Sequence, residues 1–295
     1  MSKASKDLMG SDFHIGHGTV HKWRPFKNAR HHTTYMIMLL LYYCRTVNTL
    51  QNNGDFIFVK EFIEPVSNII RVYKKMIYVP GNHCFERVSF KHHSYLFFNN
   101  VTMSPLIKRF GVWMSHAPIT TNQLRGKYNA HGHVHQENEV DPLYFNLSLE
   151  SEFMRFNLRT KEEMFASISY RESAAFDLSK SIPNHYNENA SEVSFRRQLG
   201  MIMSDPMTRA LYQHSLNVVN SEDNDIYLTF DVFIETLTKC NTIDLMSNYA
   251  NRFIKMIDAL ALTVTITEDE AFEIVKDNLN LHTETNKEGS TDDQS

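Results

Sequence analysis

The front half of the chain repeats one pattern, in which a short apolar run ends at a loop bearing Asp, His or Asn. Strands are predicted over 7–12, 75–80, 111–116 and 144–150, the last with the alternation of a half-buried strand. A helix is predicted over 33–49, with one buried face formed by Met36, Leu39, Leu40 and Tyr43. Strands alternating with helices indicate an α/β fold, in which ligands bind at the carboxyl ends of the strands.

Five short motifs stand at such loops. In chain order they are Asp12-Phe-His14, Gly54-Asp55, Gly81-Asn82-His83, Ser115-His116 and Gly132-His133-Val-His135. Each motif alone is common, but together they offer the mixed oxygen and nitrogen ligands that suit Mn, Fe, Zn or Ni better than Mg or Ca. An Asp able to bridge two His-rich half-sites can hold two cations about 3.5–4 Å apart, a pair that clamps a phosphate and activates water.

The motifs resemble those of the calcineurin-like metallophosphoesterase family: D-x-H, G-D-x-x-D, G-N-H-[D/E], a lone H and G-H-x-H. The segments 11–17, 24–26 and 146–150 resemble small bacterial and bacteriophage phosphoesterases of that family. The similarity covers residues 6–160. It implies a metallophosphoesterase-like four-layer sandwich, with two mixed sheets flanked by helices and the metals at the loops of one edge.

Carried onto this chain, the resemblance implies a role for each motif residue. Asp12, His14 and His135 would hold the first of two divalent metals, for which Mn is favoured. Asn82, His116 and His133 would hold the second, and Asp55 would bridge. His83 would sit beside the phosphate and protonate the leaving oxygen. His17 and Arg24 are candidate substrate contacts, against the alternatives of a solvated loop histidine and an Arg-Pro-Phe triplet that only shapes a loop.

Two positions depart from the family pattern. Cys84 stands where an acid usually orients the histidine, so we expect His83 to be less firmly aligned and Cys84→Asp to raise turnover. Phe58 stands in place of the second Asp of the Gly-Asp motif, and Gln51-Asn52-Asn53 is polar for a strand that delivers Asp55. Adjacent histidines point apart on a helix or strand. We therefore predict the histidine pairs at 31–32 and 92–93 to be surface residues. His131 directly precedes the last motif and is predicted only to flank it.

The back half differs in charge and pattern. Residues 1–165 hold 20 Lys and Arg against 13 Asp and Glu, whereas residues 166–295 hold 10 against 21. We predict a catalytic domain over 1–165, a linker over 166–191, a helical accessory region over 192–285 and a disordered tail over 286–295. Helices are expected near 205–219, 229–240 and 243–260, with another after the capping box Thr267–Glu270. This region is expected to be separable and to do no chemistry, so a fragment ending near Glu163 should keep both metals.

The function favoured by the sequence is hydrolysis of phosphate esters, with phosphodiesters preferred. The alternative is a weakly active or inactive binding or regulatory protein that acts through its acidic C-terminal helices, by which it could bind a protein partner or itself. A nuclease ranks lower because the acidic back half would repel nucleic acid. Three dispersed cysteines and an apolar run at 36–43 that is too short for a membrane span favour the cytoplasm, or the host cytoplasm if the chain is phage-encoded.

Overall fold

The first sheet contains two of the predicted strands, those that precede Asp12 and Asn82. The computed structural model describes residues 7–86, 88, 96, 100–136, 141–173, 192–222 and 228–288. Its first sheet has the strand order β4-β3-β2-β1-β9. The four strands β1–β4 are parallel, and β9 runs antiparallel to β1. The bounds are Asp7–Gly10 (β1), Thr49–Asn52 (β2), Lys75–Tyr78 (β3), Val101–Met103 (β4) and Arg159–Thr160 (β9).

The second sheet has the order β5-β6-β7-β8, with β5 antiparallel to β6 and the other pairs parallel. Its strands are Leu106–Arg109 (β5), Val112–Ser115 (β6), Tyr128–His131 (β7) and Tyr144–Asn146 (β8). The strand expected over 144–150 ends at Asn146, and the whole segment is buried instead of alternating. The reason is that the chain continues between the sheets, where Ser148 pairs with Ser11 at the carboxyl end of β1.

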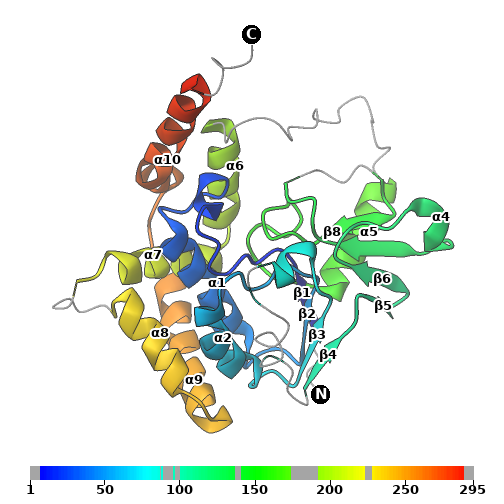
Figure 1. Ribbon diagram of the computed structural model, residues 1–295, viewed down its shortest axis with the longest axis horizontal. Coiled ribbons are helices and arrows are strands. Elements are labelled where there is room, and N and C mark those ends of the chain that lie inside the picture. Colours follow the sequence, from blue (N-terminus) through cyan, green and yellow to red (C-terminus); the bar gives the residue numbers. More distant parts are fainter. Residues whose placement is uncertain are drawn as a thin grey trace.

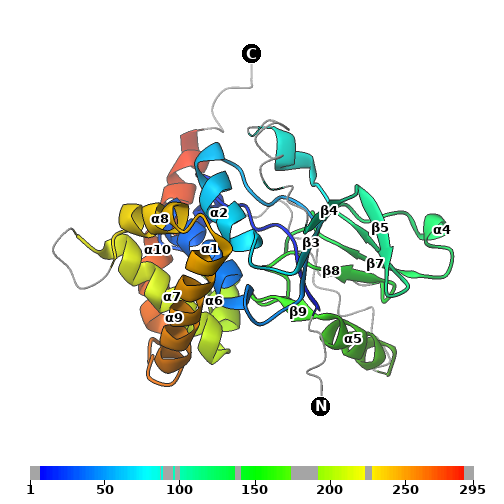
Figure 2. The ribbon, with the colours of Figure 1, turned by 90° about the horizontal axis from the view of Figure 1, so that it is seen from below.

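Helices flank the two sheets, so the expected α/β class with two mixed sheets is confirmed at this level. In Figures 1 and 2 most of the helices gather on one side of the first sheet, and the second sheet lies on its other side. The helices are Ala29–Tyr43 (α1), Ile63–Ile70 (α2), Thr121–Leu124 (α4), Lys161–Ser173 (α5), Glu192–Met203 (α6), Pro206–Asn220 (α7), Phe230–Lys239 (α8), Ile243–Ala261 (α9) and Glu268–Glu288 (α10), with 3-10 turns at Val20–Lys22 (η1), Lys60–Phe62 (η2) and Asn82–Phe85 (η3).

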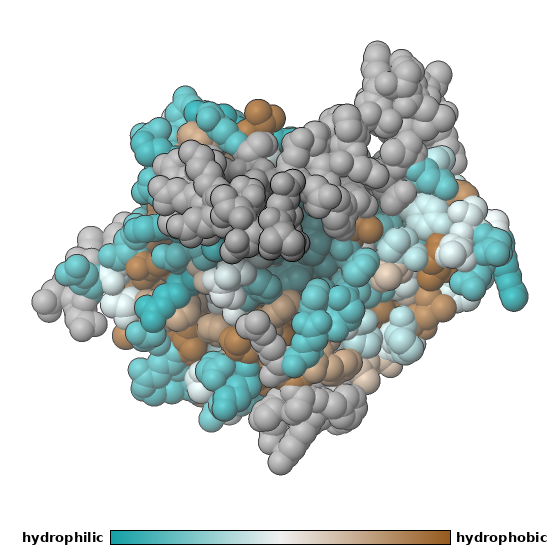
Figure 3. Space-filling model, turned by 45° about the horizontal axis from the view of Figure 1, so that its top comes forward, coloured by the Kyte–Doolittle hydropathy of each residue, from teal (hydrophilic) through white to brown (hydrophobic). Residues whose placement is uncertain are grey.

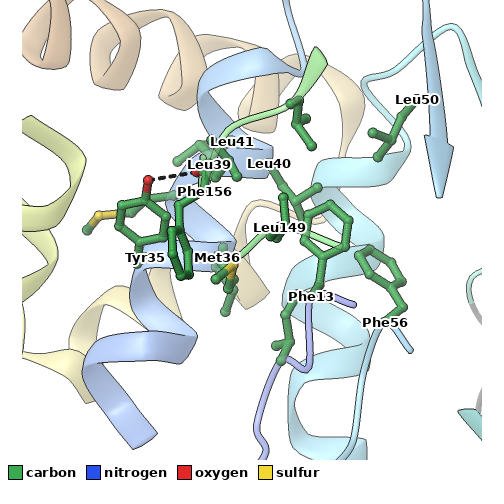
Figure 4. Packing of buried hydrophobic residues seen from close by; sticks show 14 of the residues in the cluster. Phe13, Tyr35, Met36, Leu39, Leu40, Leu41, Leu50, Phe56, Leu149 and Phe156 are labelled. Carbon is green, nitrogen blue, oxygen red and sulfur yellow. Dashed lines mark hydrogen bonds between the residues drawn. The ribbon is translucent and has the colours of Figure 1, made fainter. Parts of the chain in front are cut away.

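Helix α1 is buried on all sides, whereas the sequence predicted one buried face and bounds of 33–49. It starts earlier because the side chain of Asn28 accepts a hydrogen bond from His31 N and caps the first turn. Residues 31–41 are all buried, because the first sheet covers one side of α1 while α7 and α9 cover the other. Figure 4 shows the sheet side of this core, where the Tyr35 hydroxyl also donates to Phe156 O at 2.9 Å.

The prediction that His31 and His32 lie on the surface is wrong, because Tyr212 of α7 covers His31, and Arg24 and Phe26 pack against His32. The ring of His31 packs against that of Tyr212 at 4.6 Å, and its Nε2 lies 3.2 Å from Tyr212 O. Nε2 of His32 accepts a hydrogen bond from Arg24 at 2.9 Å. Burial lowers the pKa of His31 to about 3, so this histidine is neutral in the core.

The helices after residue 192 fall close to the predicted ranges and pack directly on the front half. Asn68 of α2 donates to Leu237 O in α8, and Asn278 of α10 donates to Phe26 O at 2.8 Å. Buried residues from both halves form one hydrophobic cluster. The expected capping box before α10 is confirmed, since Thr267 N donates to Glu270 and Glu270 N donates back to the Thr267 hydroxyl. The core is therefore continuous across residue 165.

Part of the expected linker is helical, because α5 runs through residue 173. Helix α10 likewise extends to Glu288, into the expected tail. The rest of the linker, residues 174–191, lies outside the described residues, as do the end of the tail and the histidine pair at 92–93. Within the described part of the chain, no helix combines the length and apolarity needed to span a membrane.

Candidate metal centre

All seven predicted metal ligands come together where the carboxyl ends of five strands meet. The loop after β1 carries Asp12 and His14, and the loop after β2 carries Asp55. Turn η3, after β3, carries Asn82, while the loops after β6 and β7 carry the remaining histidines. Figure 3 shows the molecule with the upper end of Figure 1 turned forward, and a hydrophilic hollow lies near the middle of that view. The topology therefore produces the convergence that the motif order predicts.

The first group consists of Asp12, His14 and His135, whose ligand atoms lie within 4.8 Å of one another. His14 Nε2 lies 3.7 Å from Asp12 Oδ1 and 3.9 Å from Asp55 Oδ2, too far for hydrogen bonds. Both ring nitrogens of His14 are buried and have no hydrogen-bond partner in the part of the chain that the structure describes. A buried imidazole without a partner is costly, and a cation between these atoms would satisfy it.

The second group contains Asp12, Asp55 and His116, again within 4.8 Å. His116 Nε2 lies 3.3 Å from Asp55 Oδ2 and 2.8 Å from Asn82 Oδ1. His133 Nδ1 lies 3.0 Å from the same Asn82 oxygen. The Asp55 carboxylate therefore stands between His14 of the first group and His116 of the second, which is the position of a bridge.

Hydrogen bonds to the far nitrogens fix two of these imidazoles. Nδ1 of His116 donates to Asn53 O at 2.8 Å, because a carbonyl can only accept. Nδ1 of His135 lies 2.6 Å from Glu150 Oε1. In both rings Nε2 is then left facing the cluster. Metal-binding histidines in proteins are oriented in the same way, by a carbonyl or carboxylate on the other nitrogen.

The backbone of the cluster is strained. Nine non-glycine residues among those described have a positive φ. Five of the nine are predicted ligands with φ between 48° and 73°: Asp12, His14, Asp55, His133 and His135. Asp and His tolerate this left-handed region better than most residues do, but they too favour other backbone conformations. Such strain gathers at functional sites, where the surrounding structure holds it in place.

Two motif glycines are required by close approach to the carboxylates. A Cβ on Gly132 would collide with Asp12 Oδ2, and a Cβ on Gly81 would collide with Asp55 Oδ1. Any side chain at either position would push a carboxylate out of the cluster. This explains in physical terms why the Asn-His and His-x-His motifs each begin with glycine.

Arg24 is buried behind the cluster, where it supports the site and does not face a substrate. Its side chain is 1% exposed and bonds Glu150 through Nη2 at 2.6 Å and Nε at 3.2 Å. Nη2 also donates to Asp12 O at 2.7 Å. We therefore correct the predicted substrate contact: Arg24 fixes Glu150, which in turn orients His135. The sequence analysis missed Glu150 as a site residue, although the segment 146–150 drew attention to it.

The partner of His83 is Glu86, which the sequence analysis also missed. Glu86 Oε2 lies 2.8 Å from His83 Nδ1, off the axis of a hydrogen bond. Cys84 points into the core, where its sulfur accepts from the Tyr78 hydroxyl at 2.8 Å and from Gly81 N at 3.1 Å. The acid expected at the position after His83 is therefore supplied three positions after it, on the same turn η3.

The polar residues before Asp55 join the two sheets. The side-chain nitrogen of Asn53 donates to Ser115 O and Ala130 O, at the ends of β6 and β7. The side chain of Asn52 accepts from Gly54 N, and that of Gln51 donates to Asn53. These bonds satisfy Gln51, Asn53 and the side-chain oxygen of Asn52 in the buried junction between the sheets, whereas Asn52 Nδ2 has no partner among the described residues.

Phe58, His17 and Trp23 form an aromatic wall beside the first group. Phe58 packs against His14 at 4.8 Å between ring centroids and against His17 at 4.6 Å. The ring of His17 also lies 5.9 Å from that of Trp23. His131, by contrast, is buried at the end of β7, where it flanks the last motif as expected.

The charges within the cluster favour a cation. Burial alone would raise the pKa values of Asp12 and Asp55, but the surrounding histidines lower both. Burial lowers the pKa of His14 to about 4. For His135, burial would also lower the pKa, but Glu150 raises it to about 9. The site thus holds ionised carboxylates and a neutral His14, and metal binding would release the proton of His135.

Comparison with known proteins adds little to this geometry. No protein-family model matches the chain, and no curated protein sequence matches it. Among solved structures the chain is similar to a protein of unknown function from Aquifex aeolicus, AQ665, with 19% sequence identity. The likeness covers 55% of this chain and 99% of that one, at a TM-score of 0.41. A similarity of this level does not assign a family.

Proposed function

We propose that this protein is a dinuclear metal-dependent phosphoesterase with the four-layer sandwich of the calcineurin-like metallophosphoesterases. The observation that carries the proposal is the convergence of the seven predicted ligands from five strand ends: five of them form two groups that share Asp12, and Asn82 and His133 lie beside His116 of the second group. Mixed carboxylate, amide and imidazole ligands suit Mn, Fe, Zn or Ni. The buried ring nitrogens of His14 support the presence of a cation, since no group of the described residues satisfies them and a cation would coordinate one of the two.

In this proposal Asp12, His14 and His135 hold one cation, and Asn82, His116 and His133 hold the other. Asp55 lies between them. When bound, two such cations clamp a phosphate and provide a water-derived nucleophile at neutral pH. Asn53 and Glu150 keep the Nε2 atoms of their histidines directed at the cluster, so the ligand geometry is set before a metal binds.

In this proposal His83 handles the proton of the leaving group. Its side chain is 40% exposed, and its ring centroid lies 6.3 Å from that of His14. Glu86 faces Nδ1, so Nε2 is the nitrogen available to a substrate oxygen. The His83 backbone N–H donates to Asp55 Oδ1 at 3.0 Å, which ties the position of this residue to the metal cluster. A general acid in this position typically contributes about 10²–10⁴-fold.

The direct test is metal stoichiometry together with hydrolysis. After loading with Mn²⁺ and removal of free metal, elemental analysis should find two Mn per chain, and the protein should hydrolyse bis(p-nitrophenyl) phosphate. His14→Gln should lose metal and activity. His214→Gln is the matched control, because it changes a histidine of α7 outside the cluster. Folded wild-type protein that retains no Mn would contradict the proposal.

The second candidate function is a binding module that uses the C-terminal helices. It is favoured by apolar side chains that stand exposed on α8 and at the start of α9, namely Val232, Ile243 and Leu245. A surface of this kind could take a protein partner or a second copy of the chain. A module of this type has no use for bound metal, so the Mn stoichiometry separates the two functions.

A further inference from the structure

Trp23 is a large apolar side chain that stands out from a fixed backbone. It is 48% exposed. Its carbonyl accepts hydrogen bonds from Gln198 at 2.9 Å and from Gln136 at 3.4 Å, and its N–H donates to Val20 O. The next residue, Arg24, is buried beneath the metal ligands. The ring is therefore held at one place on the surface, and its exposure does not come from a loose loop.

That place is next to the first metal group. Gln136, which bonds the Trp23 carbonyl, directly follows the ligand His135. On the other side, the ring of His17 lies 5.9 Å from Trp23 and 5.6 Å from the ligand His14, edge-on to both. A continuous series of ring contacts therefore connects the predicted metal ligand to the exposed indole. Phe58 packs against His17 in this series, with 4.6 Å between the ring centroids.

We propose that Trp23 binds the flat aromatic part of the substrate by stacking while the metal cluster holds the phosphate. This inference rests on the phosphoesterase function proposed above and names its substrate class: phosphate esters whose organic part carries a planar ring. An exposed indole offers a face to any such ring, and stacking on an aromatic side chain strengthens binding about 5- to 100-fold. A nucleobase and an aryl group share this chemistry.

Tryptophan fluorescence tests the contact without relying on turnover. The chain has two tryptophans, and Trp113→Phe leaves Trp23 as the only one. Trp113 lies on β6, where its indole nitrogen donates to Leu124 O, so its replacement leaves the metal cluster intact. The Mn²⁺-loaded Trp113→Phe protein is titrated with AMP and phenyl phosphate, and with the ring-free esters ribose 5-phosphate and methyl phosphate.

We expect AMP to quench Trp23 fluorescence and to bind about 5- to 100-fold more tightly than ribose 5-phosphate. In the full-length protein with Trp113 retained, Trp23→Ala should bring that ratio close to one, and Trp23→Phe should restore most of it. Quenching by AMP alone identifies a nucleobase, and quenching by phenyl phosphate as well identifies any aryl group. Equal affinity for AMP and ribose 5-phosphate in a protein that binds Mn and cleaves the test diester overturns the inference and leaves the phosphoesterase proposal standing. Loss of metal binding overturns that proposal instead.

Discussion

Replacing Arg24 with methionine tests whether this residue supports the site or binds substrate. Arg24 and Glu150 are 1% and 3% exposed, so methionine leaves the Glu150 carboxylate buried with His135 as its remaining partner. Breaking a buried ion pair by removing one partner costs about 3–5 kcal/mol. The direction of the Glu150 pKa agrees with this: burial alone would raise it, but Arg24 and His135 together lower it from 4.5 to about 2, so the ionised carboxylate depends on both partners.

The assay is urea unfolding of the metal-free protein at several pH values. Because the pKa of Glu150 is depressed in the folded state, its stabilisation is present above pH 4.5 and is lost as the pH falls toward 2. The deficit of Arg24→Met should therefore be largest near neutral pH and shrink in acid, where Glu150 takes up a proton. The control is Arg197→Met, which breaks an exposed pair with Glu152 at 2.9 Å and should cost about 1 kcal/mol or less.

Metal affinity provides the second measurement. Loss of the residue that fixes Glu150 should weaken Mn binding at the first group about 10- to 100-fold, since Glu150 orients His135. An Arg24→Met protein with unchanged unfolding free energy and a raised KM for a small diester would refute this reasoning. It would show that Arg24 meets the phosphate, as the sequence first suggested.

Three further predictions concern other parts of the chain. Contrary to the expectation from the sequence, Cys84→Asp should lower the unfolding midpoint without raising kcat, because the new carboxylate would lie near Asp55, whose Oδ1 is 3.9 Å from the present sulfur. Glu86→Gln should instead lower kcat by about tenfold or more, with Mn content unchanged in elemental analysis. A chain ending at Glu163 should be insoluble or unfolded by circular dichroism, because it exposes the side of α1 that α7 covers; a soluble, Mn-binding fragment would show that the front half folds alone.

The ligands could be predicted from the sequence because each depends on local order along the chain. A strand that ends in a loop places its Asp or His at the sheet edge, and parallel neighbours place their loops at the same edge. The strands before Asp12, Asn82 and His116 could be predicted from the sequence pattern alone. The clustering of these side chains was therefore predictable before the fold was known.

What could not be predicted depends on contacts between distant parts of the chain. His31 looked like a surface residue because its cover, Tyr212, lies 181 residues further on. Arg24 looked like a phosphate contact because Glu150, its partner, is 126 residues away. Glu86 was missed for another reason: the turn η3 brings the third residue after His83 back to its ring, a spacing that motif comparison does not consider.

The strain in the cluster bears on the choice between an enzyme and a binding module. Each non-glycine residue in the left-handed region costs roughly 1 kcal/mol, so the five ligands there cost roughly 5 kcal/mol together. To this the site adds a buried His14 ring that has no hydrogen-bond partner among the described residues and weakens the metal-free fold. Proteins typically have a net stability of 5–15 kcal/mol, so these costs are a large share of it. A protein that acts through a binding surface on α8 and α9 does not need the groups that cause them. A cation would relieve the His14 ring, because it would coordinate one of its nitrogens. The metal-free protein should therefore gain stability steeply with Mn²⁺, a gain that the module alternative does not predict.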